Sequence, residues 1–215
     1  VVRYEFIEKG AGFSANVLEP LIRSKHPNFR PVDVKTGPDG VIYIADWYNP
    51  IIQHGEVDFR DPRRDHVHGR IWRLTYKGNK TLNHPDLTNS STAELLQQLT
   101  APENWVRLHA KRLLKQRSSD VVSLELKKWL TDLDPKSPEY NHHRLEALWA
   151  YQSIRVVNQP LLNELLKNQD HRVRAAALRV AREWKDHLAN PQLEFADAIN
   201  DSHPRVRLEG VRGLS

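Results

Sequence analysis

The sequence predicts a β-then-α fold, in which a short strand region is followed by a longer set of helices. Three observations predict it. Apolar residues up to about residue 80 alternate in short runs between turn signals, those from Ser91 onward recur every three or four positions, and the helical segments themselves repeat. We therefore expect strands over residues 1–80, a linker over residues 81–90 and helical repeats over residues 91–215.

Four short runs in the first region have the composition of strands. They are Val1–Ile7, Pro31–Thr36, Val41–Asp46 and Arg70–Tyr76. The second and third are joined by Gly37-Pro38-Asp39-Gly40, a turn sequence with proline second and glycine last, so we expect them to form a hairpin. Four short antiparallel strands amount to one blade of a β-propeller, which is the architecture predicted for this region.

Helices are predicted from Ser91 to the end of the chain. Ser91 and Glu94 form a capping-box pattern that opens the first helix, and Pro102 opens the second. The later helices are expected at about 120–131, 138–154, 160–168, 171–187 and 191–200, and from residue 204 onward. Prolines at or near several of these starts support the boundaries, because a helix loses no hydrogen bond there.

The second helix of each predicted pair carries an arginine at an equivalent position. These arginines are Arg107, Arg144, Arg174 and Arg207, at spacings of 37, 30 and 33 residues. Pairs at this spacing indicate an α-solenoid of about four helix pairs, and the pattern resembles HEAT repeats. We expect the arginines to pair with nearby carboxylates (Glu103, Asp170 and Asp201) or with helix-end carbonyls. Four tryptophans are expected in the core: Trp105, Trp129, Trp149 and Trp184.

The composition excludes several kinds of chemistry. The 215 residues include no cysteine, so the chain itself has no disulfide, thiol nucleophile, Cys-ligated zinc or c-type haem attachment. The net charge of +5 is spread evenly, which does not indicate a nucleic-acid partner, and no apolar stretch is long enough to span a membrane. A lone blade, an uncapped helical array and the absence of methionine lead us to expect a fragment of a larger polypeptide.

A long connection over residues 47–69 holds the densest set of polar side chains. His66 and His68 are spaced to offer two imidazoles to a metal, with Asp46, Glu56 or Asp65 as a carboxylate ligand. A histidine–carboxylate pair can equally act as a general base, and the arginines can clamp an anion. The alternative interpretation is structural, with aspartates and arginines forming ion pairs that hold the loop in place.

Three stretches around this loop carry a family resemblance: GPDG at Gly37–Gly40, DWYNPI at Asp46–Ile51 and RDPRRDHVHGRI at Arg60–Ile71. They resemble the C-terminal propeller signature of predicted membrane-bound dehydrogenases from planctomycetes, verrucomicrobia and Bacteroidetes-type bacteria. That propeller is similar to the soluble quinoprotein glucose and sorbosone dehydrogenases, and HEAT-like repeats commonly follow it.

The resemblance implies oxidation of a sugar or polyol with pyrroloquinoline quinone (PQQ) and Ca²⁺ in an exported, periplasmic or extracellular protein. It also implies a c-type cytochrome domain elsewhere in the parent chain. The quinone-contacting residues are not placed on this sequence. For one wall of such a site we nominate five residues: Asp46, His54, Arg64, Asp65 and His68.

Two functions of different classes therefore remain open. In the first, the chain is the propeller end and HEAT extension of a quinoprotein-like sugar dehydrogenase and is inactive by itself. In the second, it is a non-enzymatic scaffold that binds a protein or polysaccharide on the concave surface of the helical repeats. The only sequence feature that favours a nucleic-acid partner is the pI near 9.4.

Overall fold

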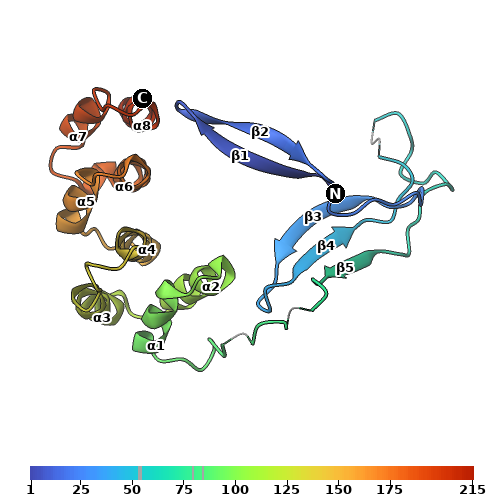
Figure 1. The fold of residues 1–215 in the computed structure, drawn as a ribbon, viewed down its shortest axis with the longest axis horizontal. Helices are drawn as coiled ribbons and strands as arrows, with labels where there is room; N and C mark the ends of the chain where they lie inside the picture. Colours follow the sequence, from blue (N-terminus) through green and yellow to red (C-terminus); the bar gives the residue numbers. More distant parts are fainter. Residues whose placement is uncertain (53–54, 79, 84) are drawn as a thin grey trace. The chain divides into compact units, whose positions relative to one another are not determined.

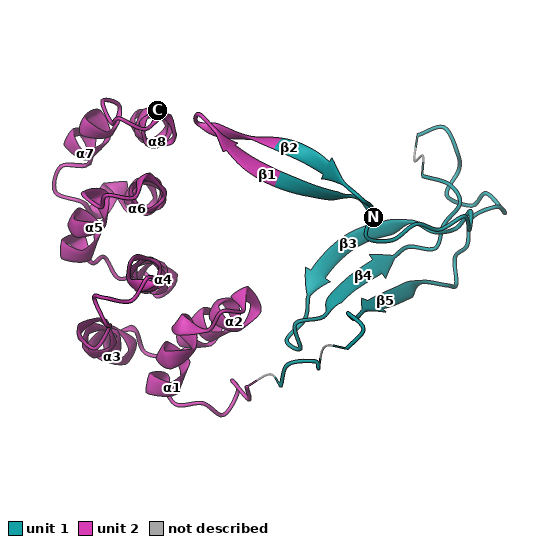
Figure 2. Ribbon diagram, viewed as in Figure 1, with its two compact units in different colours: residues 1–5, 15–84 teal, residues 6–14, 85–215 magenta. Residues whose placement is uncertain are grey.

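The computed structural model describes residues 1–52, 55–78, 80–83 and 85–215. Within these residues, strands come first and eight α-helices follow, as Figure 1 shows, so the predicted β-then-α order is confirmed. The chain divides into two compact units, which Figure 2 colours separately. Residues 1–5 and 15–84 form the first unit, and residues 6–14 and 85–215 form the second.

The first unit contains a three-stranded antiparallel sheet in the order β3-β4-β5. Its strands are β3 (Pro31–Thr36), β4 (Ile42–Asp46) and β5 (Arg70–Leu74). The central strand β4 is the most buried, and Ile44 is fully covered. Asp46, the last residue of β4, lies opposite Arg70, the first residue of β5. The long loop between these strands therefore starts and ends at the same end of the sheet.

The predicted hairpin between β3 and β4 is confirmed. The backbone N–H of Gly40 donates to the Gly37 carbonyl at 3.1 Å, and Gly40 has a φ of +72°, which glycine adopts without strain. The Asp39 carboxylate accepts hydrogen bonds from the Tyr43 hydroxyl at 3.1 Å and from Arg73 at 2.8 Å. The turn is therefore tied to both of the strands that follow it.

The remaining strands form a separate two-stranded sheet, which differs from the single four-stranded blade predicted from the sequence. They are β1 (Arg3–Lys9) and β2 (Gly12–Leu18). The side chains of β1 are exposed throughout, and those of β2 nearly so. Strand β2 was not among the runs predicted from the sequence, although its apolar residues Phe13, Ala15 and Val17 alternate with polar ones.

The helices begin and end close to the predicted boundaries. They are α1 (Thr92–Gln97), α2 (Asn104–Leu114), α3 (Ser119–Thr131), α4 (Tyr140–Ser153), α5 (Gln159–Leu166), α6 (His171–Glu183), α7 (Pro191–Ala198) and α8 (Pro204–Leu214). Short 3₁₀ turns follow α1 and α6. The capping box is confirmed, since the Ser91 hydroxyl accepts from the Glu94 N–H while the Glu94 carboxylate accepts from the Ser91 N–H.

The helices of the second unit pack consecutively around one apolar core. Helices α2, α4, α6 and α8 follow one another in Figure 1, and each contacts the next. Trp129 and Trp184 are buried in this core, and Trp105 and Trp149 pack against it half-buried, as predicted. Stacking of neighbours buries the apolar face that each short helix could not cover alone.

The recurring arginine makes the same backbone contact in three helices. Arg107, Arg174 and Arg207 each donate through Nη1 to the two carbonyls that lie six and five residues earlier, at 2.6 to 3.0 Å. The predicted helix-end role is thereby confirmed. The carboxylate partners differ from those expected, because Arg107 pairs with Glu146 and Arg174 with Asp201, both on or beside a later helix.

Gly210 on α8 is required by close packing against the end of α7. A Cβ at this position would lie 2.8 Å from the Ile199 nitrogen and 3.0 Å from the Ala198 carbonyl carbon, both backbone atoms that cannot move independently. We predict that Gly210→Ala destabilises the protein by about 1–3 kcal/mol, although alanine is the better helix former. Urea unfolding measures the change.

Gly12→Ala is the matched control, because a Cβ there meets no atom within 4 Å and Gly12 has no positive φ. Equal unfolding midpoints for the two variants would contradict the packing argument.

Candidate functional site

Short side-chain-to-backbone hydrogen bonds organise the loop over residues 47–69, which has no helix or strand in its described part. In each of them a side-chain oxygen accepts from the N–H two residues later, at 2.7 to 3.0 Å. The residues that supply the oxygen are Asp46, Asn49, Asp58, Asp61 and Asp65. These are Asx turns, so the carboxylates that are frequent in this stretch accept hydrogen bonds from backbone N–H groups.

Asp46 anchors the start of this loop from inside the first unit, where it is only 3% exposed. Its Oδ1 accepts from the N–H groups of Arg30 at 2.8 Å and Tyr48 at 3.0 Å, and its Oδ2 accepts from the Trp72 indole at 2.9 Å. Burial opposes ionisation, but these donors and the nearby Arg70 outweigh it and hold the pKa of Asp46 below its usual value. All of its hydrogen bonds here are internal, which indicates a positioning role.

Tyr48 takes a left-handed conformation, with a φ of +56°, that is rare for a bulky residue. The bond from its N–H to Asp46 supports this geometry. The Arg70 guanidinium lies 3.8 Å from the centroid of the Tyr48 ring, and His68 meets the same ring edge-on at 5.9 Å. Tyr48 was not singled out from the sequence, because nothing local predicts a positive φ for tyrosine.

Asp65 and His68 form a histidine–carboxylate pair at the end of the loop. The Nδ1 atom of His68 lies 2.9 Å and 3.1 Å from the two carboxylate oxygens of Asp65. Hydrogen bonds from the N–H groups of Val67 and His68 lower the pKa of Asp65 to about 2, with the imidazole adding to the effect. An ionised carboxylate can only accept, so Nδ1 carries a proton, and in the neutral form of the ring Nε2 is the acceptor.

Three of the five nominated residues line one pocket of about 380 Å³ in the first unit. They are Arg64, Asp65 and His68, together with Trp47, Asn49, Phe59, His66, Val67 and Gly69. The His68 side chain is 68% exposed, so it is accessible from solvent. Asp46 is not among the lining residues, and His54 lies outside the residues that the structure describes.

The arginines of the loop are engaged with the protein itself. Arg64 is buried and donates to the carbonyls of Asp58 and Val57, each at 3.0 Å. Arg63 forms an ion pair with Asp61 at 2.7 Å, as the structural interpretation predicts. These contacts leave the anion-clamp hypothesis without support from Arg63 or Arg64 in this geometry.

The metal hypothesis for His66 and His68 finds no assembled ligand set. Among the described residues, no three histidine, aspartate or glutamate side chains lie close enough together to hold a metal ion. The reason is visible at Asp65 and Asp46, whose carboxylates are already directed at backbone N–H groups.

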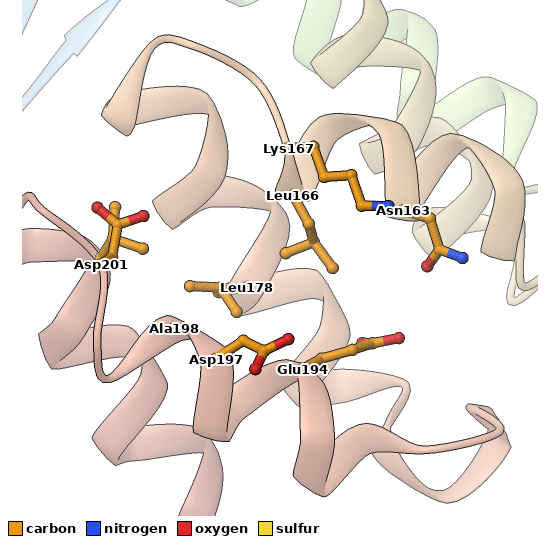
Figure 3. A pocket seen from close by; sticks show the side chains of 9 residues that line it. Asn163, Leu166, Lys167, Leu178, Glu194, Asp197, Ala198 and Asp201 are labelled. Atoms are coloured by element: carbon orange, nitrogen blue, oxygen red, sulfur yellow. The ribbon is translucent and has the colours of Figure 1, made fainter.

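A second pocket, of about 320 Å³, lies among the helices of the second unit (Figure 3). Leu166 and Leu178 give it apolar lining, and Lys167 and Asp197 give it charged lining. Glu194 also lines it, and burial raises the pKa of that carboxyl although Gln159 donates to it at 3.0 Å. The pocket combines apolar surface with a partly desolvated acid.

Comparison with known proteins identifies one similarity. Residues 1–78 match the family model of DUF7133, a domain of unknown function, and this match includes the loop over residues 47–69 and its pocket. No curated protein and no solved structure matches the chain. Within the part of the chain that the structure describes, no helix has both the length and the apolar character needed to cross a membrane.

We predict that Asp46→Asn destabilises the first unit by about 1–3 kcal/mol. Asparagine can still accept from the two backbone N–H groups, but it presents an NH₂ group to the Trp72 indole N–H, so two donors face each other. Urea unfolding measures the loss.

Trp72→Phe provides the matched partner of a double-mutant cycle, because it removes the indole donor from this pair. The Asp46→Asn change should cost less in the Trp72→Phe background. Equal costs in the two backgrounds would show that the indole bond contributes nothing.

The loop should keep its Asp65 turn to unusually low pH. The pKa of Asp65 is about 2 in the folded protein and 3.8 in its ordinary state, so its stabilising contribution is complete only above about pH 5. That contribution is lost as the pH falls toward 2, because protonation removes the carboxylate acceptor. An NMR titration of the Asp65 carboxyl carbon measures the midpoint, and a midpoint near 4 would contradict the assignment.

Proposed function

We propose that the loop pocket of the first unit is one wall of an oxidoreductase site for a sugar or polyol, with His68 as the proton acceptor. The observation that carries the proposal is the Asp65–His68 pair, in which an ionised carboxylate holds Nδ1–H and leaves Nε2 to accept. The pocket beside it offers Trp47 and Phe59 as apolar surfaces and Asn49 as a polar group. Mixed linings of this kind suit a hydroxylated ring.

His68 would accept the hydroxyl proton of the bound sugar or polyol, which leaves an alkoxide beside the imidazolium. The hydride of the oxidation would pass to a two-electron redox cofactor held by another part of the natural protein, and no residue of this wall is assigned to that transfer. Asp65 keeps the imidazole in the tautomer that can accept, and it stabilises the imidazolium that forms. Tyr48 packs edge-on against the imidazole ring and limits its rotation.

The described residues do not fit PQQ with Ca²⁺ as the hydride acceptor. PQQ carries three carboxyl groups, yet Arg63 is paired with Asp61, Arg64 donates to backbone carbonyls and Arg70 stacks on Tyr48. No set of three histidine or acidic ligands is available for Ca²⁺ among these residues. We therefore assign no step to the quinone on this wall. A haem-bearing cytochrome domain would likewise lie outside this cysteine-free chain.

The same proposal includes the architecture implied by the family resemblance. The three-stranded sheet would belong to the last blade of a β-propeller, and the helices would be HEAT-like repeats of an exported protein. The repeated contact of Arg107, Arg174 and Arg207 with carbonyls six and five residues earlier supports the second part.

The test measures sugar-dependent reduction of an electron-accepting dye by the natural protein that contains this chain. His68→Gln should lower kcat by about 100-fold or more, because a positioned general base contributes at least that factor. His66→Gln is the matched control, since His66 lines the same pocket without a carboxylate partner among the described residues. Equal activities for the two variants would rule out His68 as the base.

Partner binding by the helices is the second candidate function. The pocket around Glu194 favours it, because apolar lining beside charged groups suits a protein or polysaccharide segment. A natural protein that oxidises no sugar, but loses a bound partner when Glu194 is changed to Gln, would establish this function in place of the first.

A further inference from the structure

Two arginines of the second unit converge on the carboxylate of Glu8. Arg172, at the start of α6, donates to Glu8 Oε2 from Nε at 3.2 Å and from Nη2 at 2.9 Å. Arg205, at the start of α8, donates to Oε1 at 2.5 Å. These charge-assisted bonds lower the pKa of Glu8 to about 2, with Arg172 contributing most.

The same site recognises more than the carboxylate. Arg205 also reaches the Gly12 carbonyl at 3.4 Å, and its guanidinium lies 4.3 Å from the centroid of the Phe13 ring. Phe13 in turn meets Phe6 edge-on at 6.0 Å. The helices therefore bind three features of the β1–β2 turn region: an acidic group, a carbonyl and an aromatic face.

A stacked pair of histidines completes the cluster. The rings of His171 and His203 lie 3.5 Å apart at 18°, and His171 Nε2 is 3.6 Å from Glu8 Oε2. Asp170 lies 3.8 Å from His171, while Asp201 is bound by Arg174. The two arginines carry two positive charges against the one charge of Glu8, and each protonated imidazole would add another.

The two arginines depart from the helix repeat, which indicates a dedicated role. Each lies two residues before a recurring arginine, at a position that holds Trp105 in α2 and His142 in α4. Arg205 is only 8% exposed, and a buried guanidinium needs a bound acceptor or anion. Arg174 and Arg207 already cap helix-end carbonyls, so Arg172 and Arg205 are not needed for that purpose.

We propose that the starts of α6 and α8 form a carboxylate-binding site for an acidic protein segment with a neighbouring aromatic residue, and that Glu8 and Phe13 are its intramolecular occupants. An external segment can compete because β1 and β2 form a two-stranded, largely exposed sheet, which has little stability of its own. The contacts of Arg172 and Arg205 with Glu8 and Phe13 are ones that such a competitor would reproduce.

The test uses a chain whose tip can no longer fill the site, Glu8→Gln/Phe13→Ser. The probe is a fluorescein-labelled peptide with the sequence of residues 3–18, followed by fluorescence anisotropy. We expect saturable binding, on the order of tenfold weaker for a control peptide in which glutamine replaces the glutamate of position 8. Because the protein is the same in both titrations, a folding defect cannot imitate this difference.

Two further chains complete the experiment. The unchanged chain should bind the peptide on the order of tenfold more weakly than the variant, because its own tip occupies the site. Adding Arg172→Gln/Arg205→Gln to the variant should abolish binding, whereas adding Arg112→Gln/Lys127→Gln, which neutralises two exposed cations on α2 and α3, should not. Equal affinity for the two peptides, or absence of binding to the variant, would overturn the proposal.

Discussion

Backbone groups outside helices and strands need hydrogen-bond partners, and this requirement shapes both units of the protein. In the first unit, aspartates and an asparagine bind N–H groups two residues later along the loop. In the second unit, arginines bind the carbonyls that precede their helices. Carboxylates thus accept from unpaired backbone N–H groups in one unit, and guanidinium groups donate to unpaired backbone carbonyls in the other.

This requirement also decides which polar residues remain for chemistry. The loop looks rich in reactive groups, but Asp46, Asp61 and Arg64 are bound to backbone groups, and Asp61 also pairs with Arg63. His68 is different, because its partner Asp65 uses one edge of the imidazole and leaves the other edge accessible. The chemistry proposed for the pocket therefore depends on His68, a residue that the loop positions through Asp65 while one imidazole nitrogen stays accessible.

Local sequence signals predicted most of the fold and only part of the site. Helix starts at Ser91 and Pro204 and the turn at Gly37–Gly40 depend on nearby residues, so their patterns were sufficient. Strand β2 was missed, although its apolar residues alternate with polar ones. The left-handed Tyr48 was also missed, because no local residue pattern predicts a positive φ for tyrosine. The convergence of Arg172 and Arg205 on Glu8 was missed because it joins residues far apart in the sequence, which no spacing rule reveals.

The recurring arginine has a consequence for how the helical part tolerates changes in length. Its guanidinium reaches carbonyls six and five residues earlier in three helices, so that short segment has a fixed length. The arginines themselves are 37, 30 and 33 residues apart, so the variation in length falls elsewhere. Insertions between the end of one arginine-bearing helix and the next six-residue segment are compatible with the contact. A single-residue insertion inside the segment would detach the guanidinium from both carbonyls.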